Sequence, residues 1–172
     1  MIELPTPSAD ANFDLTVRCA REVACSLGES SAQSIQRDLA AALGRACAFV
    51  ARPISRIHVE IVDEQEMARL HEQFSNVSGV TDVLTFPSSA PLEPIDVDVV
   101  ICHGVGARVA LERGHPIERE LLLYALHGVL HCAGFDDRDT EAHSRIHAEE
   151  DRILDAIGIG RTFANRAEGE TA

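Results

Sequence analysis

One segment restricts the fold of this chain more than any other, the run ERELLLYALHGVLHCA at residues 118–133. At 3.6 residues per turn, its apolar side chains cover nearly every side of a helix instead of one stripe. Pro116 before the run and Gly134 after it are typical of a helix start and a helix end. The sequence therefore predicts a central buried helix from Glu118 to Ala133, around which the rest of the chain packs.

The other segments show two kinds of hydrophobic pattern. Some alternate apolar with polar residues, which predicts strands, and others repeat apolar residues every three to four positions, which predicts helices. The predicted strands are residues 12–20, 54–62, 81–87 and 95–102. The predicted helices are residues 34–50, a short helix after an Asp63 cap, residues 105–113, residues 118–133, and a last helix from an Asp139 or Thr140 cap to Ile157. These elements predict an α+β fold, a small mixed β-sheet covered by helices.

Length and composition are those of one globular unit. The 172 residues are 45% hydrophobic, which is enough to bury one core. We predict a single domain, residues 1–172, with a core at about 12–160 and loose ends in the first dozen residues and the tail RAEGETA. The five cysteines, an odd number without CxxC spacing, suit reduced thiols. No segment resembles a membrane span or an export signal, so we predict a cytoplasmic protein without a membrane partner. The sequence does not predict the oligomeric state.

The net charge of −13 argues against a protein that binds nucleic acid along an extended basic face. Phosphate neutralisation by basic side chains supplies most non-specific affinity for nucleic acids. The objection to an RNA substrate is partial, because a bound dication adds positive charge where a phosphate would sit.

Two histidines in the central helix are candidate metal ligands. His127 and His131 are four residues apart, so their imidazoles project side by side and can share one ion. The chain continues after Gly134 with Asp136 and Asp137, which lets a carboxylate fold back toward the imidazoles. Two histidines and one carboxylate leave one zinc position open for water, as hydrolysis requires. The alternative is a pair of core histidines, each satisfied by a backbone carbonyl.

A second pair, His143 and His147, has the same spacing on the last helix. It lies beside Glu149, Glu150 and Asp151, and this charged segment is interpreted as a solvated face.

Three motifs, in this order, resemble the YbeY family of metal-dependent endoribonucleases. TDVLTFP at 81–87 is similar to the family's TDVLSFP strand, DVVIC at 98–102 to its GDIVIC strand, and HGVLHCAGFDD at 127–137 to its HGxLHLxGYDH signature. The resemblance implies a zinc-dependent, single-strand-specific endoribonuclease that acts in maturation and quality control of small-subunit ribosomal RNA. Its partners would be a ribosomal RNA precursor and the ribosome or its small subunit.

The resemblance also implies the metal ligands, with one departure. His127 and His131 match two family ligands, and Asp137 occupies the place of the third, a histidine in the family. A carboxylate is an acceptable zinc ligand. Because carboxylates prefer harder cations, a harder divalent metal such as manganese is the alternative to zinc. Asp136 is the alternative third ligand if the loop shifts by one residue.

Two further departures concern the substrate. The family's arginine, six residues before the threonine of TDVLSFP, is Ser75 here, and Arg69, Arg108 and Arg113 are the candidates to replace it. The position after the first histidine, a glutamate in HExxH metallopeptidases, is Gly128, which argues against peptidase chemistry. Thr81 and Asp82 are candidates to orient water or substrate, with turn formation and strand capping as the alternative.

Two other functions stay open. A two-histidine, one-carboxylate site does not name its substrate, so a metal-dependent hydrolase of another ester or amide is one alternative. A ribosome-associated module with a structural metal is the other. Four protein ligands would indicate a structural metal, and three plus water a catalytic one.

Overall fold

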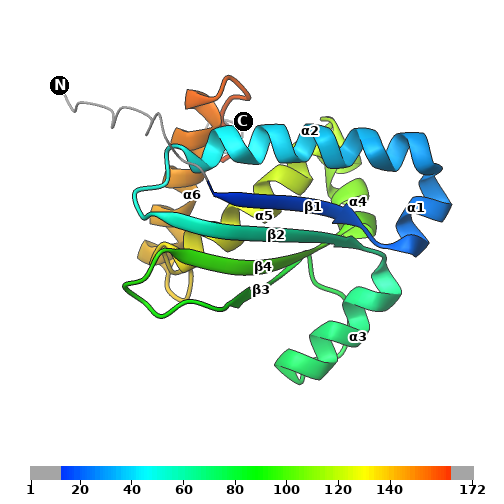
Figure 1. Cartoon of the computed structure of the whole chain (residues 1–172), viewed down its shortest axis with the longest axis horizontal. Helices are drawn as coiled ribbons and strands as arrows, with labels where there is room; N and C mark the ends of the chain where they lie inside the picture. Colours follow the sequence, from blue (N-terminus) through cyan, green and yellow to red (C-terminus); the bar gives the residue numbers. More distant parts are fainter. Residues whose placement is uncertain (1–12, 164–172) are drawn as a thin grey trace, which may run out of the picture.

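The computed structural model describes residues 13–163 and contains a four-stranded mixed sheet (Figure 1). The strand order is β1-β2-β4-β3, in which β1, β2 and β4 are parallel and β3 is antiparallel to β4. The strands are β1 Asp14–Cys19, β2 Ile54–Val62, β3 Val83–Pro87 and β4 Ile95–Cys102. The predicted mixed sheet is confirmed, and the ends expected to be loose lie outside the described residues.

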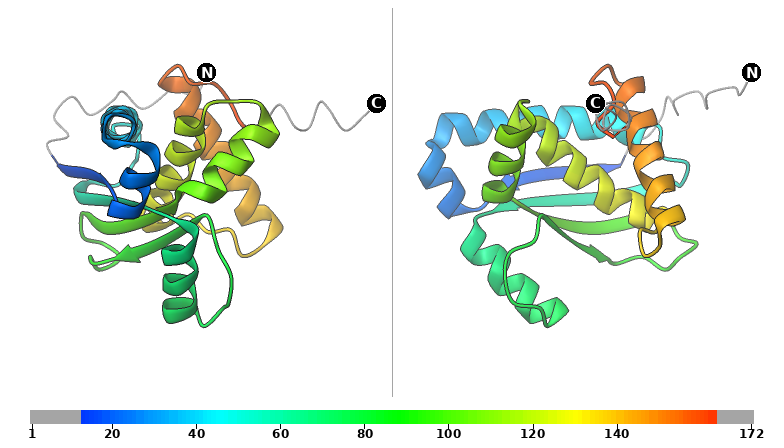
Figure 2. Two further views of the ribbon diagram at one scale, coloured as in Figure 1. Left: turned by 90° about the vertical axis from the view of Figure 1, so that its right-hand side faces the viewer. Right: turned by 180° about the vertical axis from the view of Figure 1, so that it is seen from behind.

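Helices cover mainly one face of this sheet (Figure 2). Helices α2, α4, α5 and α6 lie on that face, whereas α3 lies on the other side, at one end of the sheet. The described helices are α1 Arg21–Leu27, α2 Glu29–Cys47, α3 Glu64–Ser75, α4 His103–Arg113, α5 Ile117–Cys132 and α6 Thr140–Ala156.

The period-two alternation of the strands separates a buried face from a polar one. Ile57, Val59 and Ile61 of β2 are fully buried beneath the helices. Arg56, which precedes Ile57, projects on the opposite side and forms ion pairs with Asp96 and Asp98 of β4. The sheet therefore has one core face, which α5 contacts directly through β3 and β4.

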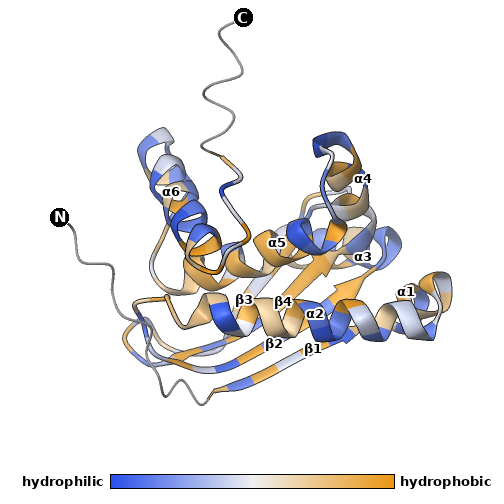
Figure 3. Ribbon diagram, turned by 90° about the horizontal axis from the view of Figure 1, so that it is seen from above, coloured by the Kyte–Doolittle hydropathy of each residue, from blue (hydrophilic) through white to orange (hydrophobic). Residues whose placement is uncertain are grey.

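The predicted central helix is confirmed as α5. Its residues from Glu120 to Leu126 and from Gly128 to Leu130 are buried, and Figure 3 shows it lying over the sheet between α2 and α4. Pro116 precedes its first turn, and Gly134 follows its end with φ of 104°, a conformation that glycine adopts without strain. These two residues mark where the helix begins and ends, and therefore where its candidate metal ligands lie.

The N-terminal helices differ from the prediction. α1 was not predicted, because its seven residues bury only Val23 and carry no helical repeat. α2 begins at Glu29, five residues before the predicted start, after Gly28 with φ of 82°. The Asp63 and Asp139 caps are confirmed, since each carboxylate accepts a hydrogen bond from a backbone N–H three residues on.

Within residues 13–163 no helix is both long enough and apolar enough to span a bilayer.

Candidate metal centre

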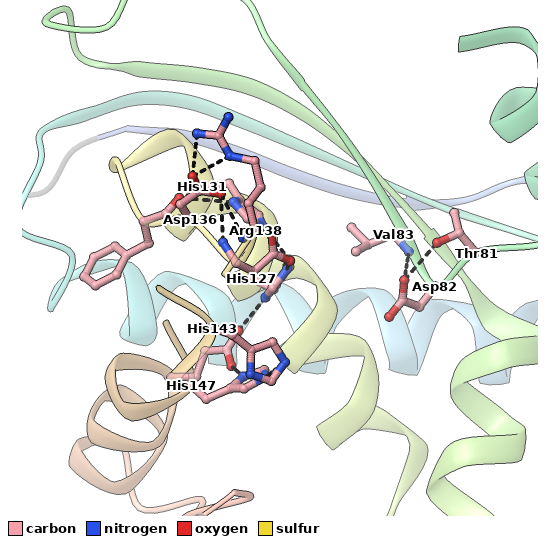
Figure 4. Close-up of polar contacts among 12 residues, drawn as sticks. Thr81, Asp82, Val83, His127, His131, Asp136, Arg138, His143 and His147 are labelled. Carbon is pink, nitrogen blue, oxygen red and sulfur yellow. Dashed lines mark hydrogen bonds and ion pairs between the residues drawn. The ribbon is translucent and has the colours of Figure 1, made fainter. Parts of the chain in front are cut away.

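The last turns of α5 place two imidazoles against each other. The Nε2 atoms of His127 and His131 lie 2.9 Å apart, and the rings cross at 86° (Figure 4). Gly128 between them allows a close approach to the sheet, since a Cβ at this position would lie 2.6 Å from Oγ1 of Thr85. The predicted pair is thus present, at the point where α5 meets β3.

An acceptor holds the other ring nitrogen of each histidine. Nδ1 of His127 lies 2.7 Å from Oε1 of Glu150, and Nδ1 of His131 lies 3.1 Å from the carbonyl oxygen of Phe135. Because an ionised carboxylate and a carbonyl only accept hydrogen bonds, each Nδ1 carries a proton and donates it. In the neutral rings both Nε2 atoms then present lone pairs to each other. Only a cation or an added proton between them makes this arrangement favourable, so the donor set fits a metal.

Asp137 completes this group from the loop that follows Gly134. Its Oδ2 atom lies 3.7 Å from Nε2 of His127 and 3.7 Å from Nε2 of His131. One ligand atom from each of the three side chains falls within 4.8 Å of the others, and no other such group of three occurs in residues 13–163. The structure therefore brings together the three predicted ligands.

The neighbouring Asp136 faces elsewhere. Its carboxylate binds the Arg138 guanidinium at 2.6 Å and accepts hydrogen bonds from the backbone N–H groups of Asp137 and Arg138. The Arg138 hydrogen bond, with those backbone donors, lowers the pKa of Asp136 to about 2. Asp136 thus shapes the turn that directs Asp137 to the histidines, and the geometry favours Asp137 as the third ligand.

One member of the second histidine pair, His147, lies beside the first pair, whereas His143 is exposed. The ring centroids of His147 and His127 are 6.5 Å apart, and Nδ1 of His147 lies 2.6 Å from Oε2 of Glu150. Glu150 is fully buried and Asp151 is 6% exposed. The interpretation of this segment as a solvated face is therefore wrong for His147, Glu150 and Asp151, because α6 turns this side toward α5, and it holds for the exposed His143.

Glu150 is the site residue that the sequence analysis missed. Its two carboxylate oxygens hold one histidine of each pair. A signal was available, since Glu150 falls on the apolar stripe of α6 with Ile146, Ile153 and Leu154. A charged residue on a buried stripe requires a partner, and here imidazoles supply it.

A cavity of about 590 Å³ adjoins the centre. His127, His143, His147, Glu150, Arg108 and Arg113 are among the residues that line it. Of the three candidate arginines, Arg69 is absent from this lining and binds Glu66 on α3. Arg113 is held at 2.6 Å by the buried Glu120, whereas Arg108 is exposed and paired with the exposed Glu64. Arg108 is thus the cation most available to a ligand in this cavity.

Thr81 and Asp82 line the same cavity just before β3. The Asp82 carboxylate accepts hydrogen bonds from the Thr81 hydroxyl at 3.1 Å and from the backbone N–H of Val83 at 2.8 Å. These contacts favour the strand-capping interpretation for Asp82 while leaving its second oxygen available to the cavity.

In the metal-free protein, the free energy of unfolding should fall as pH rises above neutrality. Burial lowers the pKa of His127, but the hydrogen bond to Glu150 and the charges of Glu150, Asp137 and Asp82 outweigh it and raise the pKa above 6.5. A histidine with a raised folded-state pKa stabilises the fold fully below the unfolded pKa, and this contribution is lost as pH rises through the folded pKa. Urea denaturation of the chelated protein from about pH 6 to pH 9 measures the loss.

Glu150→Gln provides the comparison for this pH dependence. It keeps a hydrogen-bond acceptor but removes the negative charge that raises the pKa of His127, so its stability should change less over the same pH range. Equal pH dependence in the two proteins would contradict the coupling of His127 to Glu150.

Comparison with known proteins identifies the family. The model of the family "Endoribonuclease YbeY" matches residues 23–158. The chain belongs to the YbeY family.

A relative from Acidothermus cellulolyticus, named Endoribonuclease YbeY, is 35% identical over 66% of this chain and 77% of its own length. Another of that name, from Thermobifida fusca, is 39% identical over 59% of this chain and 72% of its own. A solution structure of a Thermotoga maritima protein covers 91% of this chain and 97% of its own, with 21% identity and a TM-score of 0.48.

The family match confirms the predicted resemblance and assigns the chain to a metal-dependent endoribonuclease family. The matched range contains both histidine pairs, the loop with Asp137 and the buried Glu150. The YbeY match therefore coincides with the part of the fold that the candidate metal centre occupies.

Proposed function

We propose that this YbeY chain is a zinc-dependent endoribonuclease that cleaves single-stranded RNA, with the metal held by His127, His131 and Asp137. Its role is maturation and quality control of small-subunit ribosomal RNA in the cytoplasm, in contact with the ribosome or its small subunit, and residues 1–172 act as one domain. The observation that carries the proposal is the pair of Nε2 atoms 2.9 Å apart beside the Asp137 carboxylate, with the Nδ1 atom of each ring against a hydrogen-bond acceptor.

The protein residues have distinct parts in the reaction. A divalent metal at this site would supply Lewis-acid stabilisation of the phosphate and activation of water. Glu150 and the Phe135 carbonyl fix the ring orientation of the two histidines. Arg108 lies where it can pair with a phosphate of RNA in the adjoining cavity.

The number of protein ligands favours a catalytic over a structural role for a metal at this site. Within residues 13–163 the group comprises three side chains, not four, and Asp137 is 42% exposed. Three protein ligands leave a position for water or substrate. A structural metal in a ribosome-associated module would call for a fourth protein ligand.

The proposed activity is tested by metal analysis together with cleavage of labelled RNA by the full chain. We expect about one tightly bound zinc per chain and cleavage of single-stranded but not duplex RNA. A fully metal-loaded protein that leaves RNA intact but hydrolyses other esters or amides would replace this proposal with the general hydrolase. Cosedimentation with small ribosomal subunits tests the ribosomal role separately.

Arg108→Ala should raise the KM for RNA by about tenfold with little change in metal content, because a charge-assisted contact to phosphate contributes about 1.5–3 kcal/mol. Arg69→Ala is the matched control. Both arginines are exposed and paired with a glutamate of α3, but only Arg108 lines the cavity. Equal effects of the two substitutions on KM, measured at fixed salt, would remove Arg108 from the substrate site.

A further inference from the structure

The second histidine pair repeats the geometry of the first. Nε2 of His143 lies 3.0 Å from Nε2 of His147, and the rings cross at 89° with centroids 4.1 Å apart. In the pair of the candidate metal centre the corresponding values are 2.9 Å, 86° and 4.5 Å. Each of the neighbouring helices α5 and α6 thus carries two imidazoles, one helical turn apart, whose Nε2 atoms face each other (Figure 4).

His147 is oriented in advance by contacts on two sides. Its Nδ1 donates to Oε2 of Glu150 at 2.6 Å, so its Nε2 lone pair faces His143. Its ring stacks on Phe163 at 3.7 Å between centroids. The backbone N–H of Phe163 in turn donates to Oδ1 of the buried Asp151 at 3.0 Å. These contacts hold the ring in the orientation that a metal ligand requires, as hydrogen-bonded carboxylates do for metal-bound histidines.

Glu150 connects the two pairs. One of its oxygens accepts from His127 and the other from His147, and the side chain is fully buried. A buried carboxylate shared by two imidazoles is stabilised further when each imidazole binds a cation, because the cations offset its charge.

We propose that His143 and His147 bind a second divalent cation through their Nε2 atoms, and that this cation holds a phosphate of the RNA substrate beside the catalytic metal. Zinc suits such imidazole ligands. His143 and His147 both line the cavity with Arg108 and Arg113.

The second site should bind its ion more weakly than the first. No third His, Cys, Asp or Glu joins His143 and His147 in a metal-binding group within the described residues. The positions left open are filled by water or by phosphate oxygens. In a protein with a net charge of −13, such a cation supplies positive charge at the cavity. The role toward phosphate rests on the proposed function, whereas the binding of the ion does not.

Equilibrium dialysis of the chelated full chain against Zn²⁺, followed by elemental analysis, tests the binding. Wild type should take up one more equivalent of Zn²⁺ than His143→Ala. This second equivalent should bind at least about tenfold more weakly than the first equivalent, at His127, His131 and Asp137. His143 is exposed, so its replacement leaves the core intact. His58→Ala is the matched control. His58 lies on the opposite face of the sheet, so this variant should bind as many equivalents of Zn²⁺ as wild type.

Histidine ¹⁵N NMR assigns the ion to its ligands. The Nε2 resonances of His143 and His147 should shift as the second equivalent is added, whereas His127→Ala should leave those shifts in place. Identical zinc uptake by wild type and His143→Ala, or no shift at these two nitrogens, would overturn the second site.

Steady-state cleavage of single-stranded RNA at saturating Zn²⁺ tests the role toward phosphate. His143→Ala should raise KM by about tenfold and change kcat by less than about twofold. An unchanged KM in a variant that has lost the second ion would overturn this role. If wild type cleaves no RNA, the proposed function fails, while the dialysis result still decides the metal site.

Discussion

Replacing His131 with alanine should abolish tight metal binding and lower RNA cleavage at least about 10³-fold, which corresponds to about 4 kcal/mol of transition-state stabilisation. The loss is large because three side chains of residues 13–163 make up the group, so removal of His131 leaves the two ligands His127 and Asp137. His127→Ala should have the same effect and also deprive Glu150 of a donor. Elemental analysis and single-turnover cleavage, compared with His58→Ala, measure both effects.

Substitution of each of two adjacent aspartates, Asp136 and Asp137, identifies the third metal ligand. Asp137→Ala should weaken zinc binding by more than about tenfold, whereas Asp136→Ala should keep the metal, because the Asp136 carboxylate is turned toward Arg138. Asp137→His restores the residue that the YbeY signature has at this position and should retain the metal. The reverse pattern, with metal lost in Asp136→Ala and kept in Asp137→Ala, would assign the ligand to Asp136.

The sequence predicted the sheet well, since burial on one face leaves a direct pattern. β2 was predicted at 54–62 and is found at Ile54–Val62, and β4 agrees in the same way. The alternation is unambiguous there because Ile57, Val59 and Ile61 are all fully buried. α1 escaped prediction because a seven-residue helix with one buried side chain has no repeat to detect.

Within the candidate site, spacing predicted what lies on one helix and failed for what crosses between helices. His127 and His131 are paired by helical geometry alone, and the chain reversal after Gly134 brought Asp137 into reach. The contact of Glu150 with His127 spans 23 residues and depends on how α6 packs against α5. The apolar stripe of α6 could have shown that Glu150 is buried, but no local pattern shows which helix it packs against, so the contact of His147 with Glu150 beside α5 was missed.

Gly128→Ala should destabilise the fold by about 1–3 kcal/mol, the usual cost of adding a group to a filled core. The new Cβ would lie 2.6 Å from Oγ1 of Thr85 and 3.2 Å from Cγ1 of Val99, so α5 must move away from β3 and β4. The same movement displaces both histidines of the metal centre, and metal affinity should fall with stability. Urea denaturation and zinc titration measure the two effects.

Gly44→Ala in α2 is the matched control. Its Cβ would meet only Leu15, at an ordinary 3.6 Å, so the higher helix propensity of alanine should leave the fold as stable or stabilise it by up to about 1 kcal/mol. If Gly128→Ala matched Gly44→Ala in stability and in zinc affinity, the close packing of α5 on the sheet would not be what positions the histidines.

The packing at Gly128 also explains why this helix carries no base of its own. In an HExxH helix a glutamate follows the first histidine and acts as the general base. Here that position faces Thr85 and Val99 with no room for even a methyl group, because the helix lies directly on β3 and β4. A glutamate at position 128 therefore cannot serve as the base in this packing. Asp82 lines the same cavity as His127, so Asp82 is the first residue to replace in a search for that base.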